Sequence, residues 1–170
     1  MKSEKIALSL GGNQGDIVSN FRAALKELAA NGMTDIRVSS FYRTTAVACA
    51  EGTADFINAA ATGLWPESPE RLLGLCKKLE SAAGRAPEHP RFSDRPLDID
   101  IIFFGNAVFE KPGLIVPHPE AAERLFVLVP LAEIAGEWIF PGRKKSVSDL
   151  LEKFKNTEEY LSVISGNFNS

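Results

Sequence analysis

The segment from Arg91 to Phe104 constrains this chain most, because charged and apolar residues alternate where it becomes extended. Asp98 and Asp100 stand two residues apart, so in a β-strand both carboxylates leave the same face of the sheet. The apolar residues of the segment point to the opposite face, and they are Leu97, Ile99, Ile101 and Phe103. The pattern predicts a strand over 97–104 with two carboxylates on one face and a core on the other.

Aspartate is unfavourable in strands, so two aspartates in an otherwise apolar strand favour a functional explanation. Arg91 and Arg95 come directly before the pair. Mg²⁺-assisted phosphate chemistry needs this combination, since the metal binds carboxylates and guanidinium groups bind phosphate oxygens. The alternative is a chance Asp-x-Asp on an exposed strand, next to a loop with surface ion pairs that contribute little stability.

Length and composition indicate one domain over residues 1–170. The net charge of −3 argues against a nucleic-acid binder that relies on bulk positive charge,. No apolar run has membrane-spanning length, and the N-terminal residues lack the apolar core of a signal peptide, so we expect a cytoplasmic protein without a membrane partner. Cys49 and Cys76 have no metal-binding spacing, and Cys76 shares an apolar helical stripe, which predicts a core residue.

Hydrophobic periodicity and capping residues predict the first elements. A strand over 6–10 leads into a helix that begins at Asp16, a good N-cap, and ends at Ala30,. Ser68 and Pro69 begin a second helix that ends at Gly84,. Further strands are expected over 36–42, 56–65 and 97–104, and long loops over 44–55 and 85–96.

Beyond residue 104 the expected elements are shorter. Two extended segments lie over 107–109 and 114–116, and a helix over 119–135 is expected to be interrupted at Pro130. A capping-box-like Ser146 begins a last helix within the C-terminal region 142–170,. The order β-α-β-β-α-β predicts an α+β fold, a ferredoxin-like plait whose antiparallel sheet carries helices in three α/β/α layers. We expect the two long loops to border the active site.

Three further groups of residues have both a functional and a structural explanation. Gly11–Gly15 links a strand to a helix as a phosphate loop does, but it lacks the Walker A lysine, so a tight turn is favoured. His118 and Arg124 fit phosphate binding or structural hydrogen bonding equally well. Phe56 and Asn58 share a strand face and combine a ring with an amide that can read a heterocycle edge. Taken alone, that face is slightly more typical of a partly buried strand.

Six segments together resemble the 6-hydroxymethyl-7,8-dihydropterin pyrophosphokinase family. They occur in the family's order across residues 5 to 141, and the Arg-x-Leu-Asp-x-Asp and Pro-His…Arg-x-Phe patterns are the specific ones. The matching segments are Ala7-Leu-Ser-Leu-Gly-Gly-Asn13, Ser39-Ser-Phe-Tyr-Arg-Thr44, Asp55-Phe-Ile-Asn-Ala59, Leu79-Glu-x-x-x-Gly-Arg85, Arg95-Pro-Leu-Asp-Ile-Asp100 with Phe104-Gly-Asn, and Pro117-His-Pro followed by Arg124-x-Phe-Val-Leu128.

The resemblance implies transfer of pyrophosphate from ATP to the hydroxymethyl group of the pterin in folate biosynthesis, with release of AMP. It implies two Mg²⁺ ions on Asp98 and Asp100, with Arg95 as the third catalytic residue. It places the nucleotide against Lys77, Glu80, Arg85, Arg91, Phe92, Arg95, Ile101, His118 and Arg124. It places the pterin against Thr44, Val47, Phe56, Asn58 and Phe126. The expected partners are these two small molecules, without nucleic acid, and the chain is expected to be a monomer or a weak homodimer.

Some positions depart from the residues common in the family. They fall on the loops and the nucleotide side, and they are Thr45, Pro87, Phe92, Pro96, Gly113 and Ile115. They keep a catalytically weak pterin- or nucleotide-binding homologue as one alternative. A plait that binds RNA on its sheet is a second, less favoured because of the acidic residues on that sheet.

Overall fold

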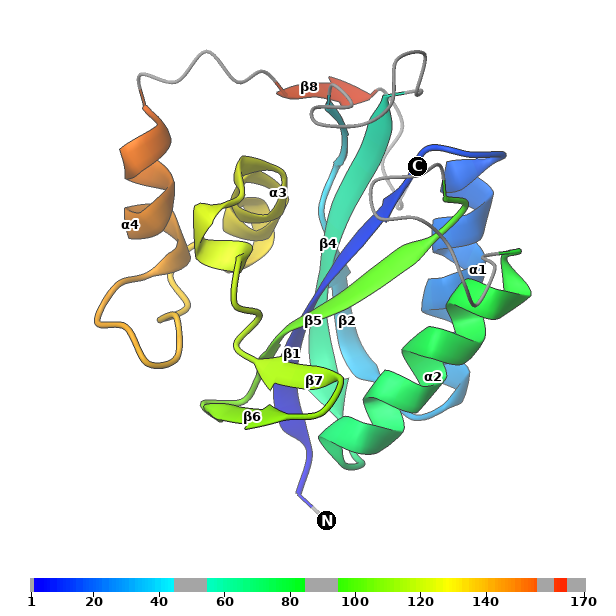
Figure 1. Cartoon of the computed structure of the whole chain (residues 1–170), viewed down its shortest axis with the longest axis horizontal. Helices are drawn as coiled ribbons and strands as arrows, with labels where there is room; N and C mark the ends of the chain where they lie inside the picture. Colours follow the sequence, from blue (N-terminus) through cyan, green and yellow to red (C-terminus); the bar gives the residue numbers. More distant parts are fainter. Residues whose placement is uncertain (1, 45–54, 85–94, 156–160, 165–170) are drawn as a thin grey trace.

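The structure is a computed structural model, and it describes residues 2–44, 55–84, 95–155 and 161–164 (Figure 1). A sheet of six strands forms the centre, in the order β5-β1-β4-β3-β8, with β2 paired to β4 beside β3. The pairings within this sheet are antiparallel. Its strands are β1 (Glu4–Gly12), β2 (Thr34–Val38), β3 (Phe41–Thr44), β4 (Phe56–Trp65), β5 (Asp98–Phe104) and β8 (Leu161–Ile164).

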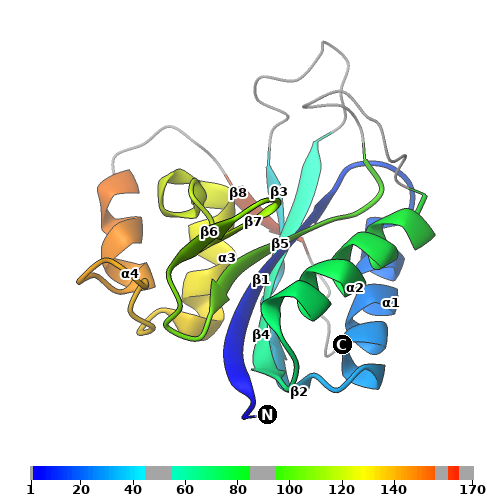
Figure 2. The ribbon, with the colours of Figure 1, turned by 60° about the horizontal axis from the view of Figure 1, so that its bottom comes forward.

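Helices cover the sheet from both sides, as Figures 1 and 2 show. On one side lie α1 (Ile17–Ala30) and α2 (Pro69–Ala82), and on the other lie α3 (Leu125–Ala135) and α4 (Val147–Leu151). The described part of the chain also contains two 3₁₀ turns, η1 (Ala121–Glu123) and η2 (Glu152–Phe154), and a small hairpin of β6 (Phe109–Lys111) and β7 (Leu114–Val116). The predicted three-layer α+β plait is therefore confirmed.

Local capping explains where the helices begin. The Asp16 side chain accepts a hydrogen bond from the Ser19 N–H at 3.1 Å, and Ser68 accepts one from the Arg71 N–H at 3.2 Å. Ser146 and Asp149 form a reciprocal capping box at α4. Each bond satisfies a backbone donor that a helix N-terminus leaves without an intrahelical partner. The predicted helix starts are confirmed at all three places.

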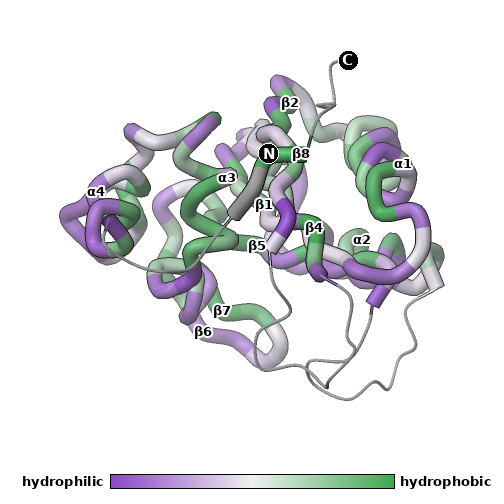
Figure 3. The backbone as a smooth tube through the Cα atoms, turned by 90° about the horizontal axis from the view of Figure 1, so that it is seen from above, coloured by the Kyte–Doolittle hydropathy of each residue, from purple (hydrophilic) through white to green (hydrophobic). Residues whose placement is uncertain are grey.

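Two apolar clusters fill the two interfaces between the layers. The larger lies between the sheet and the α1–α2 pair, and its members include Phe21, Leu28, Leu72, Cys76, Ile99 and Ile101. The smaller lies between the sheet and α3 with α4, and its members include Ala60, Ile102, Phe103, Leu128 and Phe140. α3, which is green in Figure 3, is apolar on almost all sides, as expected for a helix buried against both the sheet and α4,. Among the described residues, no helix is long and apolar enough to cross a membrane.

The aspartate strand departs from strict alternation near its end. β5 pairs with β1 through Leu8↔Ile101 and then Ala7↔Phe103, so Ile102 is an extra, bulged residue. A bulge moves every later side chain to the other face. Phe103 was predicted to share the core face of Leu97, and this is wrong, because it packs edge-on against Phe140 at 4.7 Å in the smaller cluster.

Two other local predictions are also wrong. A single strand was expected over 36–42, but the strand is interrupted at Ser39 and Ser40 between β2 and β3. The Ser39 hydroxyl accepts a bond from the Ala60 N–H at 2.9 Å, and the Ser40 N–H donates to Glu133 at 2.7 Å, so both contacts come from other elements. The predicted interruption at Pro130 does not occur, because α3 continues through it and the break comes earlier, before Leu125.

Candidate active site

Strand register brings the predicted metal and pterin residues onto one face of the sheet. Asp98 pairs with Gly11, and Gly11 pairs with Asn58 on the next strand. Paired residues of antiparallel strands point their side chains to the same face. Asp98 and Asn58 are therefore separated by one strand, or roughly 10 Å. Gly11 leaves the space between them open, since a Cβ at this position would lie 3.2 Å from the Asn58 Oδ1.

The two carboxylates of β5 share a half-buried environment. Asp98 has a 23% exposed side chain and pairs with Arg95, whose Nη1 lies 3.2 Å from its Oδ2. Burial raises the pKa of the Asp100 carboxyl above its ordinary value, and the charge of Asp98 adds to this rise. His118 and Arg124 lie close enough to oppose it. Two neighbouring carboxylates that repel each other in a partly desolvated place favour a bound cation.

The donor set fits Mg²⁺. Within the described residues, no group of three or more His, Cys, Asp and Glu side chains forms a metal cage. A protein commonly holds Mg²⁺ with one or two carboxylates and leaves the remaining positions to water and substrate phosphates. Asp98 and Asp100 supply that number of ligands on one face of β5.

Predicted nucleotide residues flank the outer edge of β5. Glu80 of α2 is only 3% exposed, and its Oε1 accepts a hydrogen bond from the Ile99 N–H at 2.9 Å. The Lys77 ammonium lies 3.6 Å from the other Glu80 oxygen. Ile101 is buried in the larger apolar cluster. The Glu80 bond holds the backbone midway between Asp98 and Asp100, so α2 helps to orient both carboxylates.

A second set of predicted phosphate residues follows β7. The His118 N–H donates to the Ile102 carbonyl at 3.1 Å, which anchors this turn to the bulge of β5. The His118 Nδ1 accepts a bond from the Glu120 N–H at 3.2 Å, which leaves Nε2 as the nitrogen that can donate in the neutral ring,. Arg124 forms an ion pair with Glu120. The structure thus brings His118 and Arg124 close to Asp100, although both follow it in the sequence by more than a dozen residues.

Two of the predicted pterin residues, Asn58 and Thr44, contact each other, and the rings of Phe56 and Phe126 each lie near a predicted phosphate residue. Asn58 is 4% exposed, and its Nδ2 donates to the Thr44 hydroxyl at 2.9 Å, so its orientation is set. The Arg95 guanidinium lies 6.0 Å from the Phe56 ring centre. The Arg124 guanidinium lies 5.6 Å from the ring of Phe126. Each aromatic ring predicted to hold the pterin therefore has an arginine predicted to hold phosphate beside it.

Four predicted site residues lie outside the described residues, namely Val47, Arg85, Arg91 and Phe92. Thr45 and Pro87, two of the departures from the family pattern, also lie there. Their assignments stay predictions.

Two residues near the site were not predicted to take part. Asn13 contacts the backbone of Arg95 with both its main chain and its side chain. Glu133 of α3 binds the Ser40 N–H at 2.7 Å and the Tyr42 hydroxyl at 2.5 Å, and burial together with this bond raises the pKa of Tyr42. Gly11 and Gly12 were expected to form a tight turn, but they belong to β1. The only sequence signal for Asn13 is its place at the end of the first family motif.

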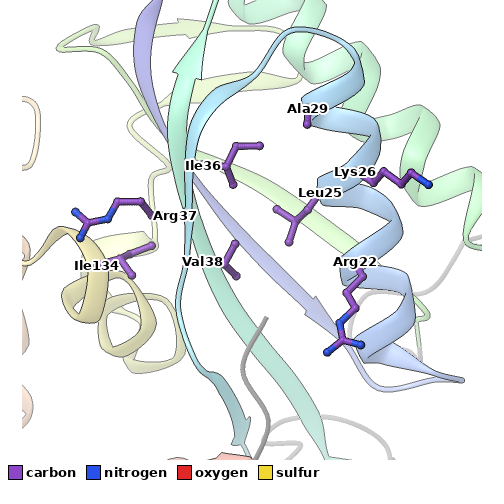
Figure 4. Close-up of a pocket in the computed structure, with 8 residues that line it drawn as sticks. All are labelled: Arg22, Leu25, Lys26, Ala29, Ile36, Arg37, Val38 and Ile134. Atoms are coloured by element: carbon purple, nitrogen blue, oxygen red, sulfur yellow. The ribbon is translucent and has the colours of Figure 1, made fainter. Parts of the chain in front are cut away.

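A separate groove lies beside the free side of β2, between α1 and α3 (Figure 4). Its lining includes no predicted site residue among those that the structure describes. Its lining combines apolar side chains with two arginines and a lysine, and consists of Arg22, Leu25, Lys26, Ala29, Ile36, Arg37, Val38 and Ile134. The polar face of β5, β1 and β4 is therefore the better candidate for catalysis.

Comparison with known proteins agrees with this choice. The family model of 7,8-dihydro-6-hydroxymethylpterin-pyrophosphokinase matches residues 7–136, which include the paired aspartates, His118 and Arg124. The chain belongs to this family. It is accordingly a pyrophosphokinase by family.

Relatives named 2-amino-4-hydroxy-6-hydroxymethyldihydropteridine pyrophosphokinase cover most of the chain. The protein of Synechocystis is 38% identical over 147 residues, which are 86% of this chain and 74% of the relative. The protein of Bacillus subtilis is 41% identical over 128 residues, or 75% of each chain. The protein of Haemophilus influenzae is 32% identical and is covered to 91% of its length. The family is connected to folate synthesis by a relative from Arabidopsis thaliana named folate synthesis bifunctional protein, which is 37% identical over 78% of this chain and 27% of its own length.

Solved structures support the fold. An HPPK-DHPS crystal structure in complex with substrates matches 92% of this chain with a TM-score of 0.67 and 13% identity. A Plasmodium falciparum HPPK-DHPS structure matches 90% with a TM-score of 0.68 and 14% identity. This chain spans only 45% and 46% of those longer chains, so the likeness concerns one part of each.

Proposed function

We propose that this protein transfers a pyrophosphoryl group from ATP to the hydroxymethyl oxygen of 6-hydroxymethyl-7,8-dihydropterin, in a Mg²⁺-dependent reaction. The observation that carries the proposal is the position of Arg95. Its guanidinium lies 3.2 Å from Asp98 and 6.0 Å from the Phe56 ring, so one side chain connects the carboxylate pair to the predicted pterin pocket.

In the proposed reaction, the pterin hydroxyl oxygen forms a bond to the β-phosphorus of ATP. The bond from that phosphorus to the oxygen it shares with the α-phosphorus breaks, and AMP leaves with the electron pair. The hydroxyl proton is lost to solvent or phosphate. Such a transfer needs alignment and charge neutralisation more than covalent help from the protein.

The chain's own residues supply both needs. Arg95, His118 and Arg124 hold phosphate oxygens with charged or polar donors from three different places in the chain. Asp98 and Asp100 hold two Mg²⁺ ions, which when bound neutralise the charge of the phosphates. Lys77, Glu80 and Ile101 border the nucleotide at the outer edge of β5, together with Arg85, Arg91 and Phe92, which are assigned by resemblance alone.

The pterin is held on the β4 side of the face. Phe56 and Phe126 sandwich its ring, and Asn58 reads its edge from a position set by Thr44. Val47 completes the pocket by resemblance. A buried amide whose orientation is fixed discriminates well between ligands, because a ligand that cannot pair with its remaining donor and acceptor leaves them without a hydrogen bond.

We extend the proposal to partners and location. ATP and the pterin are the partners, without nucleic acid or membrane, and the chain is a monomer or a weak homodimer in the cytoplasm. RNA binding on the sheet is disfavoured, since helices cover large parts of both faces and two carboxylates occupy the polar part (Figure 2),.

The experiment is a product assay. Purified protein, Mg²⁺, ATP and the reduced pterin alcohol are incubated, and nucleotides and pterins are separated chromatographically. We expect AMP and pterin diphosphate in equal amounts, and neither product when Mg²⁺ is chelated. The proposed reaction would be excluded if ADP formed instead of AMP, or if AMP formed without pterin diphosphate. Binding of both ligands without turnover would instead identify a catalytically weak homologue.

A further inference from the structure

Asn13 and Arg95 are joined by a reciprocal pair of hydrogen bonds. The Asn13 N–H donates to the Arg95 carbonyl at 2.9 Å. The Arg95 N–H in turn donates to the Asn13 Oδ1 at 2.8 Å, although the two residues are 82 positions apart in sequence. Both backbone groups of Arg95 are thus bound by a single residue at the end of β1.

The residue after Arg95 is held at the same junction. The Asn20 Nδ2 of α1 donates to the Pro96 carbonyl at 3.0 Å. The same carbonyl oxygen lies so close to Gly12 that a Cβ there would be only 2.8 Å away. The backbone of 95–96 therefore lies fixed against the β1–α1 connection.

A purely local role does not explain the Asn13 side chain. An asparagine that stabilises its own turn binds a backbone group a few residues away. Here the carbonyl oxygen of the amide instead binds the backbone of a residue that bears a functional guanidinium. The guanidinium itself lies at the end of a long side chain, so its position depends on where that backbone is held.

We propose that Asn13 is a positioning residue of the pyrophosphokinase, which fixes the Arg95 backbone and through it the guanidinium that faces the phosphates of ATP. This inference rests on the proposed function of Arg95. It assigns Asn13 no contact with substrate.

The first test is kinetic. Asn13→Ala removes the Oδ1 acceptor and keeps the backbone bond. We expect kcat/KM for ATP to fall about tenfold, since a lost hydrogen bond and a displaced guanidinium both weaken the transition state. We expect unchanged pterin affinity in the ATP-analogue complex. The matched control is Asn31→Ala, which also loses one side-chain hydrogen bond to the backbone, in this case from its Nδ2 to the Glu27 carbonyl at 2.8 Å, at the exposed end of α1. Parental kcat/KM in Asn13→Ala would overturn the inference.

The second test separates positioning from general stabilisation. If Asn13 acts through Arg95, substitution of Asn13 should change kcat/KM little in a protein that already lacks the guanidinium. In an Arg95→Ala background we expect Asn13→Ala to lower kcat/KM less than about twofold. A further tenfold loss in that background would overturn the inference, because it would show an effect independent of Arg95.

The third test does not depend on activity. In the ligand-free protein, we expect the Arg95 amide proton to exchange with solvent at least about tenfold faster in Asn13→Ala than in the parent. Asn13→Asp keeps an oxygen acceptor and is expected to retain slow exchange. Equal exchange rates in the parent and Asn13→Ala would overturn the inference. If the parent forms no AMP while exchange changes as expected, only the proposed function fails.

Discussion

The two faces of the central sheet are built from the same strands but are organised differently. The face toward α1 and α2 is apolar through its centre, where its residues include Leu8, Leu10, Ala59 and Ile99. The face toward α3 is divided. One part of it is apolar at Ala7, Ala60 and Phe103, whereas the other part carries Asn58, Asp98 and Asp100.

The difference teaches how one sheet can combine stability with chemistry. Burying apolar side chains against two helices stabilises the fold, and that face has no need of polar groups. On the other face, the bulge at Ile102 returns β5 to apolar packing directly after its two carboxylates. The polar residues are thereby placed on rigid strands, with an apolar cluster next to them to hold those strands in place.

The largest expected effect concerns the apolar face. Phe21 is fully buried and packs edge-on against Phe41 at 5.7 Å. Phe21→Ala is expected to lower the free energy of unfolding by about 3–5 kcal/mol, through lost burial and a cavity. Urea denaturation measures it, and kcat of the folded fraction should stay within about twofold if the two faces are independent.

The control is Val108→Ala, because Val108 is 64% exposed. Its free energy of unfolding should change by less than about 0.5 kcal/mol. A Phe21→Ala protein with parental stability would show that the α1–α2 face does not carry the fold.

The next effect concerns the polar face. Asp98→Asn and Asp100→Asn are each expected to lower kcat at least about a hundredfold, equivalent to roughly 3 kcal/mol, because each removes an anionic metal ligand. The melting temperature of Asp100→Asn should not fall, since the change removes one of two neighbouring like charges, whereas Asp98→Asn also loses the ion pair with Arg95,. Asp35→Asn is the control, because Asp35 has φ 51° on an edge strand and asparagine tolerates that conformation,. Near-parental AMP formation by both site variants would refute the metal assignment.

A smaller effect is expected at the aromatic ring beside Arg124. Phe126→Ala should weaken pterin binding by about 1–3 kcal/mol, by analogy with aromatic stacking on bases. Affinity for an ATP analogue should change little. Isothermal titration calorimetry with each ligand measures both, and Phe154→Ala, a partly buried ring on η2, is the control. Equal losses for the two ligands would remove Phe126 from the pterin pocket.

The smallest effect is expected at Gly11, which lies between Asp98 and Asn58 in the sheet. Gly11→Ala places a methyl group 3.2 Å from the Asn58 Oδ1 and forces that amide to shift. A shift of a few tenths of an ångström weakens a hydrogen bond that this buried amide makes, which is worth about 0.5–1.5 kcal/mol, so pterin affinity should fall by up to about tenfold. Gly74→Ala in α2 is the matched control, since its new Cβ meets no other atom within 4 Å. Unchanged pterin binding in Gly11→Ala would show that Asn58 does not read the ligand.

Much of the site could be predicted, because its residues lie in short and specific motifs. The spacing of Asp98 and Asp100 requires that both side chains lie on one face of any extended strand. The register through Gly11 shows that Asn58 lies on the same face of the sheet. The fold class followed from the order of elements. The roles of the individual site residues stay predictions until the substitutions above are measured.

Sequence by itself determined the helix starts at Asp16, Ser68 and Ser146, because a cap is a contact between residues three positions apart. Only the tertiary structure decided where contacts come from distant segments. At the interruption between β2 and β3, Ser39 binds the Ala60 N–H, and α3, which continues through Pro130, packs in the smaller cluster through Leu128 and Leu131. The Arg95 backbone depends on Asn13 in the same way. A single hydrogen bond between distant residues leaves no periodic pattern in the sequence, so it can be identified only in the tertiary structure.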